Sequence, residues 1–306
     1  MNVFLLTINN YACANTKSGS AKINKYVLFC LLIMLNGCSR VEHLPLVNFN
    51  IKYQDQLLKC GIEFDHLSKQ WQLKQLQFFV SNIALKNKQG SWHSWLMQKN
   101  PHQSHNVALI GEQCSDIKNH FNEWTINLSE QLNLNDYTAI KFTLGVPFEL
   151  NHLNPLTQPS PLNDSSMFWV WQTGHKFLRL ELTNADENWL FHLGSTGCNA
   201  PSAVRAPKNE CKYPNRVNVE LDLPKEWQNT KSKENETRQQ QSINSLDINI
   251  DLAKLLNGLA LNANTFCQSS PDNESCKPLL SALGVKDKNN NSKMRKTNVF
   301  GIKINE

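Results

Sequence analysis

The amino-acid sequence predicts an all-β fold, an antiparallel β-sandwich with long polar loops and one or two short helices. Short apolar segments recur along the chain and are separated by turns rich in Pro, Asn and Gly. In Val217–Leu223 the odd positions are apolar and the even positions polar, which is the two-residue period of a half-buried strand. Helical patterns are confined to Asp251–Gly258 and Lys277–Leu283.

The predicted strands are rich in apolar, β-branched or aromatic residues and end at polar turns. Leu76–Leu85, for example, runs into the turn signal Asn87-Lys88-Gln89-Gly90. In chain order the predicted strands are Leu76–Leu85, Thr138–Leu144, Met167–Trp171, Phe177–Leu182, Trp189–Leu193, Val217–Leu223 and Asn298–Ile304.

Residues 39–306 are interpreted as one domain whose surface carries polar insertions. Gln228–Ser242 contains no apolar residue. Because such a segment cannot offset its ordering entropy by burial, we expect a mobile loop there. Lys286–Lys296 is a similar polar run, and strand-like segments follow both runs, so neither is a domain boundary.

Residues 1–38 have the pattern of an export signal. Lys22 and Lys25 precede the apolar run Tyr26–Leu35, whose length of about ten residues is too short for a bilayer core that needs roughly 20. The ending Leu35-Asn36-Gly37-Cys38 resembles a bacterial lipobox, in which Cys38 becomes the lipidated first residue of the mature protein. Because Ser39 rather than Asp follows, the resemblance implies the periplasmic face of the outer membrane. The alternative is a plain membrane-anchor helix or an internal core helix.

Charge and motifs argue against nucleic-acid binding and catalysis. From Ser39 onward the chain has 28 basic and 26 acidic side chains and no basic run, so it lacks the electrostatic footprint of a nucleic-acid-binding protein. The sequence has no GxGxxG, P-loop, HExxH or GxSxG motif, and Ser195 comes too early in Gly194-Ser195-Thr196-Gly197 for a nucleophile elbow. We expect a protein that is not an enzyme.

The cysteines after Cys38 are predicted to form three disulfides, because an exported chain meets oxidising conditions. Six cysteines allow 15 connectivities, so the pairing stays open at this level. Pairs at spacings of 13 and 9 would enclose short polar loops, and the remaining pair follows by elimination. These pairs are Cys198 with Cys211, Cys267 with Cys276, and Cys60 with Cys114. Thiolate metal ligation is the alternative, although no CxxC pair exists.

Several long blocks of sequence occur in a fixed order between Gly145 and Cys198. They read Gly145-Val-Pro-Phe-Glu-Leu-Asn-His152, Ser160-Pro-Leu-Asn163, Phe168-Trp-Val-Trp171 and Phe191-His-Leu-Gly-Ser-Thr-Gly-Cys198. This succession closely resembles the MbnP family of periplasmic copper-binding proteins, also described as four-cysteine partners in metallo-mystery pairs. The resemblance extends from near Cys60 to Cys276.

The resemblance implies an all-β sandwich, a bound copper ion and an oxidised tryptophan. In the family, a tryptophan of the paired motif can be converted to kynurenine. That oxidation is attributed to a partner diheme oxidase of the MauG or MbnH type, similar to bacterial cytochrome c peroxidases. The chain would then be a substrate of this partner, held at the membrane by its lipid anchor.

His152 and His192 stand in the motif positions and are the candidate copper ligands. A neutral imidazole nitrogen donates a lone pair to copper. His152 is expected in a loop after a strand, and His192 on the strand face opposite Trp189, Phe191 and Leu193. A lone histidine on such a strand is more often a hydrogen-bonded core or edge residue. The family positions of both histidines favour ligation.

Trp169 and Trp171 are the candidate modified residues and possible metal ligands. An indole has no free lone pair for a metal, whereas kynurenine carries an aryl amine and a ketone that can both donate. The two residues are spaced to lie on one face of the predicted strand, and the sequence does not choose between them. The alternative function is a metal-free outer-membrane lipoprotein whose exposed tryptophans stack on a glycan or another hydrophobic ligand.

Overall fold

The structure, a computed structural model of the chain, describes residues 46–104, 106–114, 121–130, 133–225, 245–285 and 297–302. All of them belong to one compact unit, His43–Glu306. The predicted signal segment with Cys38 and the predicted polar insertion 228–242 lie outside the described residues. In the part that the structure describes, no helix combines the length and the apolar character needed to cross a bilayer.

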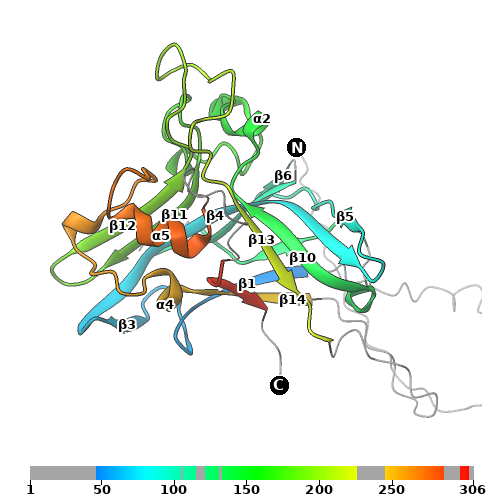
Figure 1. Cartoon of the computed structure of the whole chain (residues 1–306), viewed down its shortest axis with the longest axis horizontal. Helices are drawn as coiled ribbons and strands as arrows, with labels where there is room; N and C mark the ends of the chain where they lie inside the picture. Colours follow the sequence, from blue (N-terminus) through cyan, green and yellow to red (C-terminus); the bar gives the residue numbers. More distant parts are fainter. Residues whose placement is uncertain are drawn as a thin grey trace, which may run out of the picture. The chain divides into compact units, whose positions relative to one another are not determined.

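The fold is an all-β sandwich, as the sequence predicts, and its strands form two sheets (Figure 1). Among the described residues, the smaller sheet has five strands and the larger sheet has ten. The smaller sheet contains β1 (Leu46–Tyr53), β2 (Gln56–Leu57), β9 (Thr125–Asn127), β14 (Ser245–Asp251) and β15 (Phe300–Ile302). The larger contains β3 (Glu63–His66), β4 (Lys69–Asn87), β5 (Trp92–Ser94), β6 (Gln103–Ser104), β7 (Val107–Gln113), β8 (Asn122–Glu123), β10 (Tyr137–Leu144), β11 (Lys176–Thr183), β12 (Asn188–Gly194) and β13 (Val217–Asp222).

The smaller sheet has the strand order β15-β14-β1-β2 and contains one parallel pair, β1 with β14. Every second residue of β1 is buried, from Val47 to Tyr53, so this strand presents one face to the core. Phe49 of β1 meets Phe78 and Phe142 of the larger sheet edge-on, at ring-centroid distances of 5.5 and 5.8 Å. These aromatic contacts close the sandwich.

The larger sheet is built around β4, which extends over 19 residues. The first half of β4 pairs with β11 and its second half pairs with β10, while β7 lies along its other edge. The register of the β4–β10 pairing shifts near Asn82, an exposed residue with a φ of 54°, which marks a bulge in β4. The order β12-β11-β4-β10-β13 therefore places β11 and β12 at one edge.

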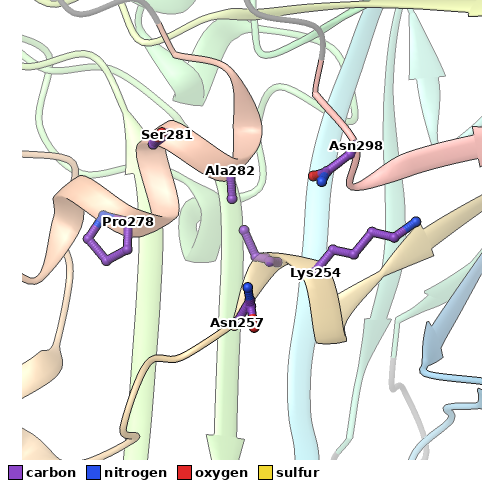
Figure 2. Close-up of a pocket in the computed structure, with 7 residues that line it drawn as sticks. Lys254, Asn257, Pro278, Ser281, Ala282 and Asn298 are labelled. Carbon is purple, nitrogen blue, oxygen red and sulfur yellow. The ribbon is translucent and has the colours of Figure 1, made fainter.

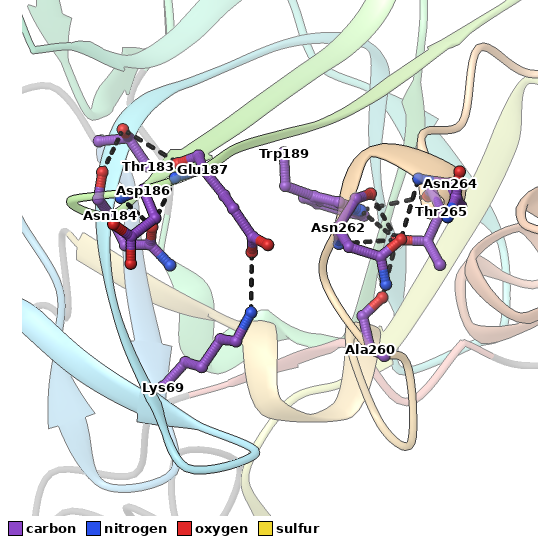
Figure 3. Close-up of polar contacts among 10 residues, drawn as sticks. All are labelled: Lys69, Thr183, Asn184, Asp186, Glu187, Trp189, Ala260, Asn262, Asn264 and Thr265. Atoms are coloured by element: carbon purple, nitrogen blue, oxygen red, sulfur yellow. Dashed lines mark hydrogen bonds and ion pairs between the residues drawn. The ribbon is translucent and has the colours of Figure 1, made fainter.

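The β11–β12 hairpin is fixed at its turn and at its outer edge (Figure 3). In the turn, the side chain of Asn184 accepts hydrogen bonds from the backbone of Asp186 and Glu187, and Glu187 pairs with Lys69 of β4 at 3.0 Å. The indole of Trp189 donates to Thr265 at 3.1 Å.

Residues after the 3-10 turn at Ala263–Thr265 extend the pairing of β12. Phe191 forms a parallel bridge with Cys267, and the backbone of Cys267 accepts from His192 and donates to Leu190. The outer edge of β12 is therefore paired at Leu190–His192.

Two elements differ from the sequence prediction. Met167–Trp171 is not a strand, because Ser165–Met167 forms a 3-10 turn and the following residues enter a tight turn in which Phe168 bridges only to His175. A short helix that the sequence did not indicate, α2 (Phe148–Asn151), follows Pro147. The predicted helices are present as α4 (Leu252–Leu255) and α5 (Cys276–Leu283), with α4 shorter than expected.

All three predicted disulfides are present. Cys60 is bonded to Cys114, Cys198 to Cys211 and Cys267 to Cys276, across sequence separations of 54, 13 and 9 residues. The first staples the segment before β3 to the end of β7. The second closes the loop that follows β12, and the third holds α5 beside the edge of the larger sheet.

Candidate metal centre

His192 lies on β12 and has one ring nitrogen bonded and one free. Its neighbours Phe191 and Leu193 point into the core, fully buried, while His192 lies on the opposite face and is itself 7% exposed. Nε2 lies 3.0 Å from Oε1 of Glu181. Because a carboxylate only accepts, Nε2 is the donor, and in the neutral ring Nδ1 carries the lone pair. Nδ1 is buried and has no hydrogen-bond partner among the described residues.

Glu181 is held as a carboxylate by the groups around it. Burial alone would raise its pKa, but hydrogen bonds from His192 and from Arg179, together with the charge of Arg179, outweigh burial and lower the pKa to about 2. Arg179 donates from Nε to Glu181 Oε1 at 2.6 Å and lies in register with His192 on the neighbouring strand. The sheet register therefore assembles Arg179, Glu181 and His192 on one face.

His152 sits at the C-terminal end of α2, not in the loop after a strand that the sequence suggested. The ring is 5% exposed, and Nδ1 donates to the backbone carbonyl of Trp171 at 3.1 Å. Nε2 then carries the lone pair and faces the side-chain amide of Asn151 at 3.1 Å and Sγ of Cys211 at 3.8 Å. Burial lowers the pKa of His152 against the opposing effect of the Trp171 carbonyl, which favours the neutral ring.

Trp169 and Trp171 lie on a tight turn between Phe168 and His175 and not on the predicted strand. The turn is closed by bonds from the Trp169 amide to the Gly174 carbonyl at 3.1 Å and from the Gly174 amide to the Val170 carbonyl at 2.7 Å. Both tryptophans are half-buried. We refer to Phe168–His175 as the tryptophan turn.

The tryptophan turn contacts the surroundings of both histidines. The ring of Trp169 lies over Gly194, two residues beyond His192 on the same face of β12. A Cβ atom added to Gly194 would come within 2.6 Å of Trp169 Cζ3. The carbonyl of Trp171 orients His152.

His175, which the sequence left without a role, is a fully buried support for the tryptophan turn. Its backbone amide donates to Asn151 Oδ1 at 2.9 Å, while Nδ1 faces the Asn151 carbonyl at 3.1 Å and Nε2 faces the Leu162 carbonyl at 3.0 Å. The ring also meets Phe79 and Phe168 edge-on. His175 therefore ties α2, the 160–163 segment and the tryptophan turn together.

Two groups of potential metal-ligating side chains occur among the described residues. Within each group the ligand atoms lie within 4.8 Å of one another. One is His152 with Cys198 and Cys211, and the other is Glu112 with Cys60 and Cys114. In both groups the sulfur atoms belong to disulfides, so neither offers a thiolate. His192 belongs to neither group, and the two histidines have separate hydrogen-bond partners.

A pocket elsewhere in the described residues has different chemistry. It lies between α4, α5 and the segment before β15, and Figure 2 shows its lining side chains. The lining residues are Lys254, Leu255, Asn257, Pro278, Ser281, Ala282 and Asn298. None of them is a histidine, cysteine or carboxylate, so this pocket has no ligand set for copper.

Comparison with known proteins identifies a family and a fold. The MbnP family profile matches residues 45–277. Among solved structures, the chain is similar to MbnP from Methylosinus trichosporium, with a TM-score of 0.65 and 19% sequence identity, covering 84% of this chain and 97% of that chain. At this identity the structural likeness shows the fold alone. No curated protein matches the chain.

Proposed function

The chain belongs to the MbnP family, and from that premise we propose that it is an exported, lipid-anchored copper-binding protein. We propose further that it is the substrate of a diheme oxidase of the MauG or cytochrome c peroxidase type, which converts Trp169 or Trp171 to kynurenine. In this proposal the chain is not itself an enzyme, and Cys38 carries the lipid at the periplasmic face of the outer membrane.

The observation that carries the copper proposal is the free Nδ1 of His192. A buried polar atom without a hydrogen-bond partner lowers the stability of a folded protein. The unpartnered Nδ1 of His192 therefore supports a bound ligand that accepts its lone pair. Histidines that bind metals commonly donate their other N–H to a carboxylate or a backbone carbonyl. His192 does the first through Glu181, and His152 does the second through the carbonyl of Trp171.

The residues present fit copper better than a harder ion. Imidazole nitrogen suits copper, whereas Mg²⁺ and Ca²⁺ prefer sets of oxygen ligands. His192 would bind through Nδ1 and His152 through Nε2. Copper bound there would supply a soft electrophilic centre for nitrogen donors, including the aryl amine of a kynurenine at Trp169 or Trp171. The position of the tryptophan turn against both histidines supports this choice of residues.

Elemental analysis of the full chain purified after co-expression with its oxidase tests the proposal. We expect the wild-type protein to retain copper and the His152→Ala/His192→Ala double variant to lose it. His93→Ala, an exposed histidine outside the motifs, is the matched control. Equal copper retention in the double variant would overturn the ligand assignment.

The modification is tested on a tryptic peptide. Cleavage after Lys141 and Lys176 releases one peptide that contains both tryptophans. Fragmentation should place the mass of kynurenine on Trp169 or Trp171 in the co-expressed protein, and unmodified tryptophan should remain when the oxidase is omitted. Unmodified peptide in both preparations would count against the proposed partner. It would favour the metal-free binding module instead.

A further inference from the structure

Exposed apolar side chains lie on the tryptophan turn and on two loops that are hydrogen-bonded to it. Among the described residues, four large apolar side chains on the loops at this end of the sheets are exposed. Two of them are exposed most, Leu156 at 90% and Val204 at 66%. The others are Leu153 and Val170. We call these four residues the apolar rim. Large exposed apolar side chains on neighbouring loops can mark an interaction site.

The three loops that carry the apolar rim are joined by hydrogen bonds. Leu153 follows His152, whose ring donates to the Trp171 carbonyl. Val170 lies between the two tryptophans. The loop with Val204 is joined to the tryptophan turn through the Gln172 amide, which donates to the Ala203 carbonyl at 3.1 Å, and the Gln172 side chain, which donates to the Cys198 carbonyl at 3.1 Å. Figure 1 shows α2 and the loop that follows β12 rising together at one end of the sheets.

The loop that presents Val204 is basic. Arg205, Lys208 and Lys212 are exposed, and neither Arg205 nor Lys208 forms an ion pair with a described residue. The one carboxylate between Asn199 and Lys212, on Glu210, is already paired with Arg216 at 3.0 Å. An apolar centre beside exposed charges of one sign is the anatomy of a protein docking face, and it favours a partner with an acidic rim.

We propose that the apolar rim and the adjacent Arg205 and Lys208 form the docking face for the electron-accepting partner that oxidises the tryptophan turn with a peroxide as the terminal oxidant. Two peroxide molecules deliver two oxygen atoms across the indole C2–C3 bond and leave as water, and hydrolysis then releases C2 as formate to give kynurenine. This inference rests on the proposed function. Electron transfer slows steeply with distance, so the partner must approach the half-buried Trp169 and Trp171 closely. The apolar rim lies on the tryptophan turn and on the loops bonded to it, and the basic residues beside it select an oxidase whose own docking face is apolar at the centre and acidic at its edge.

A basic apolar face could also rest on an anionic membrane. That occupant would cover the tryptophan turn and keep a protein oxidant away from it, which conflicts with oxidation of Trp169 or Trp171. The geometry therefore favours a protein partner, and the membrane is tested as the competing outcome.

The test measures the rate at which a purified diheme oxidase of the MauG and cytochrome c peroxidase class, from the same organism and supplied with hydrogen peroxide, forms kynurenine in the full chain. The Leu156→Ser/Val204→Ser variant removes two rim side chains that contribute little to the core. We expect its rate at low concentration of the chain to fall about ten-fold, through a higher KM with kcat retained. The matched control Leu67→Ser/Leu96→Ser changes exposed leucines on other loops and should keep the wild-type rate.

A charge variant and a vesicle assay complete the test. Arg205→Glu/Lys208→Glu should slow modification at low salt, and the difference from wild type should shrink as salt is raised. Wild-type rates in both the rim and the charge variants would overturn the docking face and leave the proposed function intact. No kynurenine even in wild type would overturn both. If the rim variant lost binding to phosphatidylglycerol vesicles but kept the wild-type modification rate, the docking face for the oxidase would be overturned and a membrane contact favoured.

Discussion

Nε2 of His192 donates a hydrogen bond to Oε1 of Glu181 across 3.0 Å, from one strand of the β11–β12 hairpin to the other. The same carboxylate oxygen accepts from Nε of Arg179 at 2.6 Å. Glu181 thereby fixes both the orientation and the tautomer of His192, and it leaves Nδ1 as the atom with a free lone pair.

Removing this carboxylate should weaken copper binding. We expect Glu181→Ala to lower the copper affinity by about 10–100-fold, because His192 loses the partner that aims Nδ1. Glu181→Gln keeps an oxygen that accepts from Nε2 and should lose less. The measurement is competition for Cu(I) with a chromophoric chelator. Glu187→Ala, on the turn of the same hairpin, serves as the control, and equal affinities in all three variants would remove the positioning role of Glu181.

Gly194 should be intolerant of a side chain. A Cβ atom there would lie 2.6 Å from Trp169 Cζ3 and 2.8 Å from the His175 carbonyl, so Gly194→Ala must displace the tryptophan turn. We expect a loss of about 1–3 kcal/mol in the free energy of unfolding, with a changed tryptophan emission spectrum. Gly301→Ala, in β15, meets nothing within 4 Å and should change neither. Urea denaturation followed by fluorescence compares the two, and similar losses in both would contradict this packing.

The disulfides should differ in their contributions to stability. In the chain-entropy account, the loop of 13 residues closed by Cys198 and Cys211 is worth about 3 kcal/mol, and the loop of 54 residues closed by Cys60 and Cys114 about 4 kcal/mol. Paired Cys→Ala variants, compared by urea denaturation, should fall in that order. A Cys198→Ala/Cys211→Ala variant that loses more than the other pair would show that this bridge also stabilises the loop beside His152 through packing.

The free energy of unfolding should fall on acidification, because two buried histidines have lowered pKa values in the folded chain. Burial lowers the pKa of His175, against the opposing effects of the Leu162 and Asn151 carbonyls, and burial also lowers the pKa of His152. The unfolded chain therefore binds more protons than the folded chain once the pH falls below the ordinary histidine value of 6.5. The stability present above that value is lost as the pH falls toward the folded pKa values.

The expected slope is at most about 1.4 kcal/mol per pH unit for each of the two histidines. Urea denaturation between about pH 7.5 and about pH 5.5 measures it. His175→Gln should flatten the dependence, whereas His93→Gln, at an exposed site, should leave it as in wild type. An unchanged slope in His175→Gln would assign the acid sensitivity to other groups. Glu181 does not enter this window, because its pKa is about 2.

Strands with a local signature were predictable from the sequence. Val217–Leu223 alternates apolar and polar residues, and Trp189–Leu193 is rich in apolar and aromatic residues. The two predictions agree to within a residue with β13 and β12. Met167–Trp171 was predicted wrongly, since its aromatic composition is also that of a turn whose rings pack inward. The helix α2, at four residues, is too short to show a period.

The candidate site was predictable only as a set of residues. His192 could be placed on its strand face because alternation is local. Its partner Glu181 could not be found, because that contact depends on the register between β11 and β12, which brings Arg179 opposite His192. The support from His175 likewise depends on three segments that meet only in the folded chain.

The bridge between Phe191 and Cys267 has a further consequence for the behaviour of the protein at high concentration. An exposed strand at the border of a sheet offers its amides and carbonyls to any second molecule, which is a common route to oligomers and fibrils. Here the stretch Leu190–His192 is occupied by a segment that the Cys267–Cys276 bond holds in place. These backbone groups are therefore not available to pair with a strand of a second molecule, and this part of the sheet edge does not promote self-association at high protein concentration.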